Sequence, residues 1–345
     1  MDVVTPTYGG DEAGMICGYH FTPGRAPEPL GAAQAVAWLQ AQALAAPGDR
    51  LAGDFLWLHM NLSHASAERW LLQHARLCDE FFEALRDDVR STRIERANDA
   101  LVAVVNDLSF DFSFDASDIA TLWVSVTDAL VVTARREPLR SVDQLRKAVK
   151  GGAPLRSTAE LLEHLLRDQA DLLVNVVRKT TMRVDRIEDQ LLTGRLNTQR
   201  ASLGTLRRLL VRLQRLLAPE PAALFRLLQH PPAWVTEHDL QELRQATEEF
   251  SMVLQDMVSL QERIKLLQEE VATMVNEQNN RSLFVLTIVT VLALPINMIA
   301  GLLGMNVGGI PLAEDPYGFW IIVAIVLTFT ALAGWWAFRR QRDND

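Results

Sequence analysis

Two charge-free stretches near the C-terminal end limit the fold more than any other feature of this 345-residue sequence. Residues 282–303 form a run of 22 residues without a charge, and residues 319–338 form a second run of 20. About 20 apolar residues are needed to cross a bilayer as a helix, so both runs are long enough. Two buried helices of a soluble core are the alternative, but such helices normally keep a charged or polar face. The sequence therefore predicts two transmembrane helices.

The flanking charges orient this hairpin. Arg281 precedes the first run, whereas a basic tail of Arg339, Arg340 and Arg342 follows the second. The loop between them, residues 304–316, contains two acidic residues and no lysine or arginine. The positive-inside rule then places both termini in the cytosol and the loop in the periplasm. The first residues show no secretory signal, so we expect a multi-pass protein of the bacterial inner membrane whose N-terminal domain stays in the cytosol.

The first run carries a stripe of polar and small residues. At 100° per residue, these side chains fall within roughly a third of the helix circumference. The stripe consists of Asn280, Leu283, Thr287, Thr290, Leu294, Asn297 and Gly301. An asparagine in the middle of a membrane is costly against lipid, so it should face another helix or water. Hydrogen bonds between helices would explain the stripe, but the mixture of residues favours a water-containing pore. Pro295 either only kinks the helix or frees the carbonyl of Val291 for the ion path.

One such helix cannot enclose a channel. The second run has Thr328 and Thr330 as its only hydroxyl residues and is otherwise typical of a lipid-facing helix. Several copies of the first helix must therefore surround a common axis, which predicts a symmetric oligomer.

The helix that enters the membrane is predicted to begin far upstream. Residues 236–294 contain neither glycine nor proline, and apolar residues recur there every three or four positions. Residues 236–303 are thus predicted to form one helix of about 100 Å. Residues 236–280 hold ten acidic and three basic residues. This charge either concentrates cations at the inner mouth or marks an ordinary solvated face. Residues 157–229 read as two long helices broken near residues 191–199, which we expect to pack antiparallel against this acidic stalk.

The N-terminal part differs in pattern. Strand-like runs occur at residues 15–21, 55–61, 100–110 and 119–134, and helical patterns separate them. The last run is predicted to be a hairpin that turns at Thr127-Asp128. We expect an α+β cytosolic domain with a mixed sheet over residues 1–155, a helical region over 156–280 and a transmembrane hairpin over 281–345.

Composition and motifs argue against other classes of protein. The formal net charge of −9 is unlike that of a nucleic-acid-binding protein. We find no phosphate-binding loop, no HExxH motif and no nucleophile elbow, so an enzyme and a bound cofactor are not expected. His74 and Cys78 are four residues apart on a predicted helix and could share a metal, although chance explains this spacing as well.

The segment that ends the first run is rich in glycine. Residues 301–311, GLLGMNVGGIP, contain four glycines, which suit a simple turn or the close approach of several chains around an axis. Neither run contains histidine, cysteine or a carboxylate. Asparagine, threonine and backbone oxygens suit a divalent cation that keeps much of its water shell.

These features resemble the CorA superfamily of divalent-cation transporters. The resemblance is carried by two C-terminal spans, the Gly304-Met305-Asn306 triplet and the basic tail, and it is strongest over residues 236–342. The continuation NVGGIP is similar to the ZntB branch, the zinc transporters, as are LWLHMN and LVVTARREPL in the N-terminal part. The family's usual Trp-Leu pair at the end of the chain is absent.

The resemblance implies a funnel-shaped homopentamer whose first spans line the pore. It implies that Gly304, Met305 and Asn306 form the outer selectivity site, with Asn306 contacting the hydrated ion. The residues that match pore-lining positions of the family are Asn280, Leu283, Leu294 and Asn297. The three arginines of the tail take the place of a basic ring at the inner mouth.

The resemblance to the ZntB branch implies transport of Zn²⁺, with proton-coupled uptake preferred over efflux. A magnesium or broad divalent-cation channel is the alternative within this class. A membrane-anchored scaffold or sensor is the alternative outside it. The expected partners are further copies of the chain, the lipid bilayer and divalent cations, and no nucleic acid.

Overall fold

The computed structural model describes residues 10–44, 53–87, 92–115, 118–192, 199–305 and 315–342. Its contacts divide the chain into two compact units, Met1–Gln268 and Glu269–Asp345. One long helix, α8 (Glu237–Leu303), contributes to both units. The boundaries predicted at residues 155 and 280 stay a prediction.

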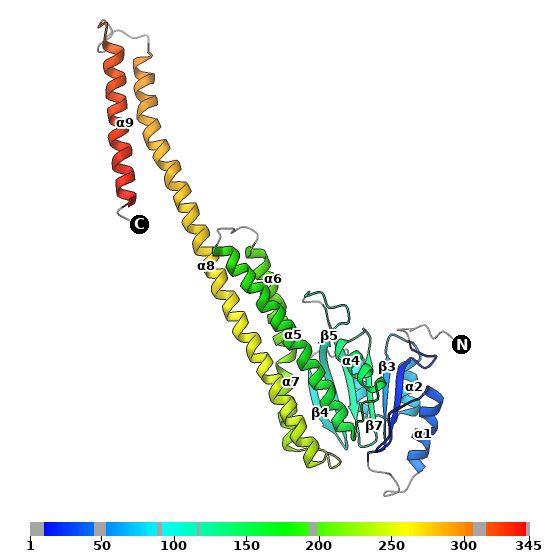
Figure 1. The fold of residues 1–345 in the computed structure, drawn as a ribbon. Coiled ribbons are helices and arrows are strands. Elements are labelled where there is room, and N and C mark those ends of the chain that lie inside the picture. Colours follow the sequence, from blue (N-terminus) through cyan, green and yellow to red (C-terminus); the bar gives the residue numbers. More distant parts are fainter. Residues whose placement is uncertain are drawn as a thin grey trace. The chain divides into compact units, whose positions relative to one another are not determined.

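Strands of the first unit form one mixed sheet in the described part of the chain (Figure 1). They are β1 (Met15–Phe21), β2 (Glu28–Pro29), β3 (Phe55–Asn61), β4 (Arg93–Ala97), β5 (Ala100–Leu108), β6 (Ile119–Val126) and β7 (Leu130–Arg135). Their order across the sheet is β2-β1-β3-β7-β6-β5-β4. The β3–β7 pair is parallel and the other neighbouring pairs are antiparallel, so the predicted mixed sheet is confirmed.

Helices cover both faces of this sheet. One apolar core lies between the sheet and α1 (Ala32–Leu44), α2 (Ala67–His74) and α3 (Asp79–Arg86). The other lies between the sheet and α4 (Arg140–Lys150), α5 (Thr158–Leu192) and α7 (Pro219–Gln229). A strand covered on both faces is apolar along its whole length rather than alternating. This explains why β3, FLWLHMN, is buried at six consecutive residues.

The helices beside the first part of α8 differ from the prediction in number and direction. The segment predicted as the second long helix is divided into α6 (Gln199–Leu217) and α7, because Pro219 begins a new helix. The predicted antiparallel packing is wrong for α5. Ser157, just before α5, donates to Asp239 near the start of α8 at 2.8 Å, and Asp185 pairs with Arg263 farther along both helices at 2.8 Å. Both contacts advance together along the two helices, so α5 runs parallel to α8.

Packing between α6 and α8 is antiparallel, as predicted. Arg207 donates to Gln268 at 3.2 Å, whereas Gln261, earlier in α8, donates to Gln214, later in α6, at 2.9 Å. Ion pairs join α8 to α5 and to the residue just before it in both senses. Arg156, before α5, pairs with Glu242 of α8 at 3.5 Å, whereas Arg263 of α8 pairs with Asp185 and Glu188 of α5.

The second unit contains the remainder of α8 and α9 (Gly318–Arg342). Figure 1 shows these two helices side by side. The prediction of one unbroken helix over residues 236–303 is confirmed to within one residue, and Pro295 lies inside it without ending it. Both helices contain a stretch long and apolar enough to cross a membrane.

Candidate functional site

The polar stripe of α8, which lies in the second unit, is exposed along its whole length. Every stripe residue, from Asn280 to Gly301, is exposed in the single chain. Leu283 and Leu294 retain 60% and 62% of their accessible surface, although both are large and apolar. A surface of this kind within a membrane-length segment is therefore available to water or to another chain.

The opposite side of the same helix packs against α9. Half-buried residues recur on this side every three or four positions, among them Phe284, Ile288, Leu292, Ile296, Ile299 and Leu303. Where α8 ends and α9 begins, the two helices enclose an apolar hollow of about 700 Å³, lined by Ile299 from α8 and by Phe319 and Ile322 from α9. At 100° per residue, this side lies roughly 160° from the centre of the stripe. Within one chain, α9 therefore leaves the stripe uncovered.

The threonines of the stripe present oxygen acceptors to their surroundings. Thr287 Oγ1 donates to the Leu283 carbonyl, and Thr290 Oγ1 donates to the Leu286 carbonyl, each at 2.8 Å. Because the hydroxyl proton is used within the helix, the lone pairs of each oxygen remain for an outside partner. Such oxygens suit a cation or its hydration water.

The glycines at the end of α8 differ in their surroundings. Gly304 N donates to the Ala300 carbonyl at 2.9 Å, and a Cβ on Gly304 would lie only 3.1 Å from that oxygen. A Cβ on Gly301 would meet open space in the single chain. The contacts of one chain therefore favour glycine at position 304 and leave position 301 unexplained. Met305 is half exposed. Asn306 and most of the predicted loop lie outside the described residues.

The stripe continues inward beyond the residues that we predicted. Glu269, Thr273 and Asn276 precede Asn280 on the same seven-residue spacing, and all three are exposed. Our interpretation of the sequence stopped at Asn280, because it began from the apolar run. Extending the seven-residue repeat toward the N-terminus would have found them. The stripe thus begins with a carboxylate and continues with amide and hydroxyl side chains, among which Leu283, Leu294 and Gly301 are interspersed.

The basic tail continues α9, which extends to Arg342. The Arg339 guanidinium lies over the Trp335 ring, 5.1 Å from its centroid. The side chains of Arg340 and Arg342 lie outside the described part of the structure. Whether the three arginines form a ring stays a prediction.

Buried acids in the first unit have raised pKa values. Burial raises the pKa of Asp107, on β5, to about 6, although Ser141 Oγ donates to it at 2.5 Å. Burial raises the pKa of Glu220, on α7, to about 8. His59, also buried, has a pKa well below its usual value and is neutral. These groups belong to the packing of the domain rather than to an open site.

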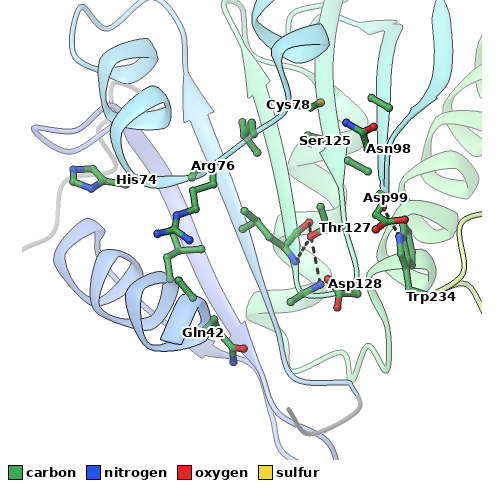
Figure 2. Close-up of a pocket in the computed structure, with 18 of the residues that line it drawn as sticks. Gln42, His74, Arg76, Cys78, Asn98, Asp99, Ser125, Thr127, Asp128 and Trp234 are labelled. Atoms are coloured by element: carbon green, nitrogen blue, oxygen red, sulfur yellow. Dashed lines mark hydrogen bonds between the residues drawn. The ribbon is translucent and has the colours of Figure 1, made fainter. Parts of the chain in front are cut away.

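Among the described residues, no group of three or more His, Cys, Asp and Glu side chains is placed to hold a metal. The prediction that His74 and Cys78 lie on one helix is wrong. His74 ends α2, whereas Cys78 precedes α3, and Figure 2 shows the two side chains at separate places.

Comparisons with known proteins point in one direction. The sequence pattern of the family described as CorA-like Mg²⁺ transporter protein matches residues 52–340. The divalent cation transporter CmaX of Pseudomonas aeruginosa is 29% identical over 337 residues, which cover 96% of this chain and 98% of that protein. The zinc transport protein ZntB of Yersinia enterocolitica is 22% identical over 280 residues, or 81% of this chain and 85% of that protein.

Solved structures share the fold. The structure of full-length CmaX matches with a TM-score of 0.78 and 27% identity, and covers 96% of this chain and 99% of its own. The CorA magnesium transporter of Methanocaldococcus jannaschii matches with a TM-score of 0.72 and 17% identity, and covers 92% and 96%.

Proposed function

The chain belongs to the CorA-like Mg²⁺ transporter protein family, and we propose that it carries Zn²⁺ into the cytosol through an axial pore lined by the polar stripe of α8. The function that family membership supports is divalent-cation transport of the CorA and ZntB kind, and not catalysis. The chain is a membrane protein with two candidate spans. We place it in the bacterial inner membrane with both termini in the cytosol, on the strength of Arg281 and the basic tail.

The observation that carries the proposal is the uncovered stripe. Within one chain α9 packs on the far side of α8, and the stripe, in which oxygen-bearing side chains are interspersed with Leu283, Leu294 and Gly301, stays exposed from Glu269 to Gly301. Exposure of Asn297 to lipid would be costly, so copies of α8 should turn this side toward a common axis. No contact within one chain requires glycine at position 301. In an oligomer, Gly301 would allow the backbones of neighbouring copies to approach closely. We propose a homopentamer, in line with the family resemblance.

The chemistry of the stripe favours a cation that remains partly hydrated. The described stripe within the candidate span holds amide and hydroxyl oxygens and no carboxylate, so it lowers the cost of passage without binding an ion tightly. A carboxylate at Glu269 adds negative potential at the inner end. We assign the outer selectivity site to Gly304, Met305 and Asn306, with the Asn306 amide oxygen toward the hydrated ion. The cation is the substrate, and we propose no resident cofactor.

Replacement of Asn306 by leucine tests the selectivity site. We expect Asn306→Leu to abolish divalent-cation flux in proteoliposomes while the oligomer, measured by native mass spectrometry, stays intact. Val307→Leu, next to the triplet, is the matched control and should keep its flux. Normal flux through Asn306→Leu would rule out the assigned site.

A magnesium or broader divalent-cation channel is the second candidate. It is favoured by the relative at 29% identity, which is named a divalent cation transporter, and by the Mg²⁺ in the family description. Zinc is favoured by the NVGGIP continuation and by relatives named zinc transport proteins. Parallel Zn²⁺ and Mg²⁺ flux measurements separate the two candidates, and an outward preference would indicate efflux.

A further inference from the structure

A buried carboxyl group lies where α6 ends and α7 begins. Glu220 follows Pro219 in the first turn of α7 and is 0% exposed within the single chain. Among the described residues no cation pairs with it, and its Oε1 atom has no hydrogen-bond partner. An ionised carboxylate is costly in such an interior without a cation, so the packed state keeps this group neutral.

A neutral side chain links Glu220 to the sheet. Gln169, on α5, donates through Nε2 to the Asn106 carbonyl of β5 at 2.7 Å and to Glu220 Oε2 at 3.3 Å. Thr92, just before β4, donates to the Leu216 carbonyl near the end of α6 at 2.7 Å and lies 3.3 Å from Asn106 Nδ2. Buried polar contacts thus hold the α6–α7 joint to the sheet, and of these five residues only Glu220 can ionise.

Neighbouring acids oppose the ionisation of Glu220. The Asp107 carboxylate, on β5, adds to the effect of burial, which is the main cause of the raised pKa of Glu220. Asp107 also repels Asp168, on α5. Three carboxyl groups from three different elements therefore influence one another in this interior.

Basic groups near the joint act on other partners. Arg140 of α4 and His164 of α5 act on the two other acids. Arg96 of β4 donates to the Pro231 carbonyl, beyond the far end of α7, at 3.5 Å. The remaining charged residues of β4 pair with each other, and the nearest basic residues of α6 and α7 are exposed: Arg93, Glu95, Arg212, Arg215 and Arg226. In the described part of the chain, no cation is therefore in place to stabilise an ionised Glu220.

Helix α6 connects this joint to α8. A single residue, Ala218, separates α6 from α7, and its N–H donates to the Gln214 carbonyl at 2.8 Å. The Gln214 side chain accepts from Gln261 of α8 at 2.9 Å. A movement of α7 away from the sheet would therefore change the contacts between α6 and α8.

From this arrangement we propose that Glu220 is a proton-dependent latch: its protonated carboxyl holds the α6–α7 joint on the sheet, and loss of the proton as the pH rises loosens α7 and the last turns of α6. The latch lies in the sheet-containing unit, and its action requires no ion in the pore.

The direction of the effect follows from where the carboxyl ionises. In the packed state Glu220 stays protonated to about pH 8, whereas in an opened state that exposes it to water it ionises near pH 4.5. Opening therefore releases a proton between these two values, and each pH unit raises the ratio of opened to packed joint about tenfold.

Hydrogen–deuterium exchange, read by mass spectrometry on the purified full-length protein in detergent without divalent cations, tests the latch. Parent and Glu220→Gln are compared at the same pH, so that the intrinsic pH dependence of amide exchange cancels. From pH 6 to pH 7.5, we expect the exchange rate of the parent relative to the variant to grow about 30-fold in peptides of α7 and the end of α6. Peptides of β3 and β7, in the middle of the sheet, should show no such growth.

Glu237→Gln replaces an exposed glutamate in the first turn of α8 and is the matched control, which should exchange like the parent at both pH values. An exchange ratio in α7 that does not change with pH would overturn the latch, because a purely structural role of Glu220 involves no proton. Equal growth in every helix and strand would also overturn it, since the carboxyl would then act on the whole unit rather than on one joint. The measurement involves no ion flux, so its outcome is separate from that of the transport experiments.

Discussion

Replacing Glu220 by glutamine is expected to stabilise the protein, and the gain should grow as the pH rises. Glu220 lies in the first turn of α7 and is 0% exposed. Its Oε2 accepts a hydrogen bond from Gln169 Nε2 at 3.3 Å, and the nearby Asp107 carboxylate adds repulsion. Burial is the main reason that its pKa is raised from 4.5 to about 8. Glutamine keeps the shape and can still accept from Gln169, but it carries no charge.

The size of this gain follows from the difference between the pKa of the Glu220 carboxyl in the folded state and its pKa in the unfolded state. In the unfolded chain this carboxyl ionises near pH 4.5, whereas in the folded chain it stays protonated to about pH 8. Folding above pH 4.5 must therefore take up a proton. The stability that the protonated group confers is complete below pH 4.5 and is lost as the pH rises through about 8. Each pH unit above 4.5 lowers the free energy of unfolding by about 1.4 kcal/mol. At pH 7 the buried glutamate therefore costs about 3 kcal/mol of stability, which Glu220→Gln should recover.

Urea unfolding of the full-length protein in detergent, followed by tryptophan fluorescence, measures this difference. We expect Glu220→Gln and the parent protein to differ by less than about 1 kcal/mol at pH 5 and by about 3 kcal/mol at pH 7. Glu237→Gln replaces an exposed glutamate in the first turn of α8 and should change the stability little at either pH. A difference for Glu220→Gln that is the same at both pH values would refute the reasoning.

Three further substitutions follow from the described contacts. Asn297→Leu should lower divalent-cation flux more than Ile299→Leu, since Asn297 is on the exposed stripe and Ile299 is on the side that packs against α9; equal losses would mean that the stripe is not the pore wall. Glu269→Gln should reduce flux at low ionic strength and have less effect at high salt, because screening weakens the carboxylate's attraction; a reduction that salt does not change would argue against an electrostatic role. Arg263→Ala removes two partly exposed ion pairs with α5 and should lower the free energy of unfolding by only about 1 kcal/mol, because solvent screens both pairs. A loss of several kcal/mol in urea titrations would show that these pairs are not screened.

The elements with the strongest hydrophobic pattern could be predicted from the sequence. The strands at residues 15–21 and 55–61 and the turn at Thr127-Asp128 are confirmed, because covered strands are apolar throughout and a hairpin needs a polar turn. The long helix is confirmed because nothing in residues 236–294 interrupts it.

Elements without a strong hydrophobic pattern, and packing that depends on distant partners, were missed. β4, RIERA, is a polar edge strand that pairs with β5 across the Asn98-Asp99 turn. The direction of α5 depends on where the sheet places its first residue, Thr158, whose hydroxyl donates to the Thr127 carbonyl at 2.7 Å. The inward extension of the stripe was missed for a different reason: Glu269, Thr273 and Asn276 lie outside the apolar run and are recognisable only by their spacing.

The most direct test of the central claim is Zn²⁺ flux into proteoliposomes loaded with a zinc-sensitive dye, with and without an inward proton gradient and with Mg²⁺ in parallel. We expect Zn²⁺ influx that grows with the proton gradient and is lost in Asn306→Leu. Mg²⁺ influx that does not depend on the proton gradient would indicate a passive channel rather than a proton-coupled zinc transporter. Absence of flux of either ion through an intact oligomer would contradict a pore along α8.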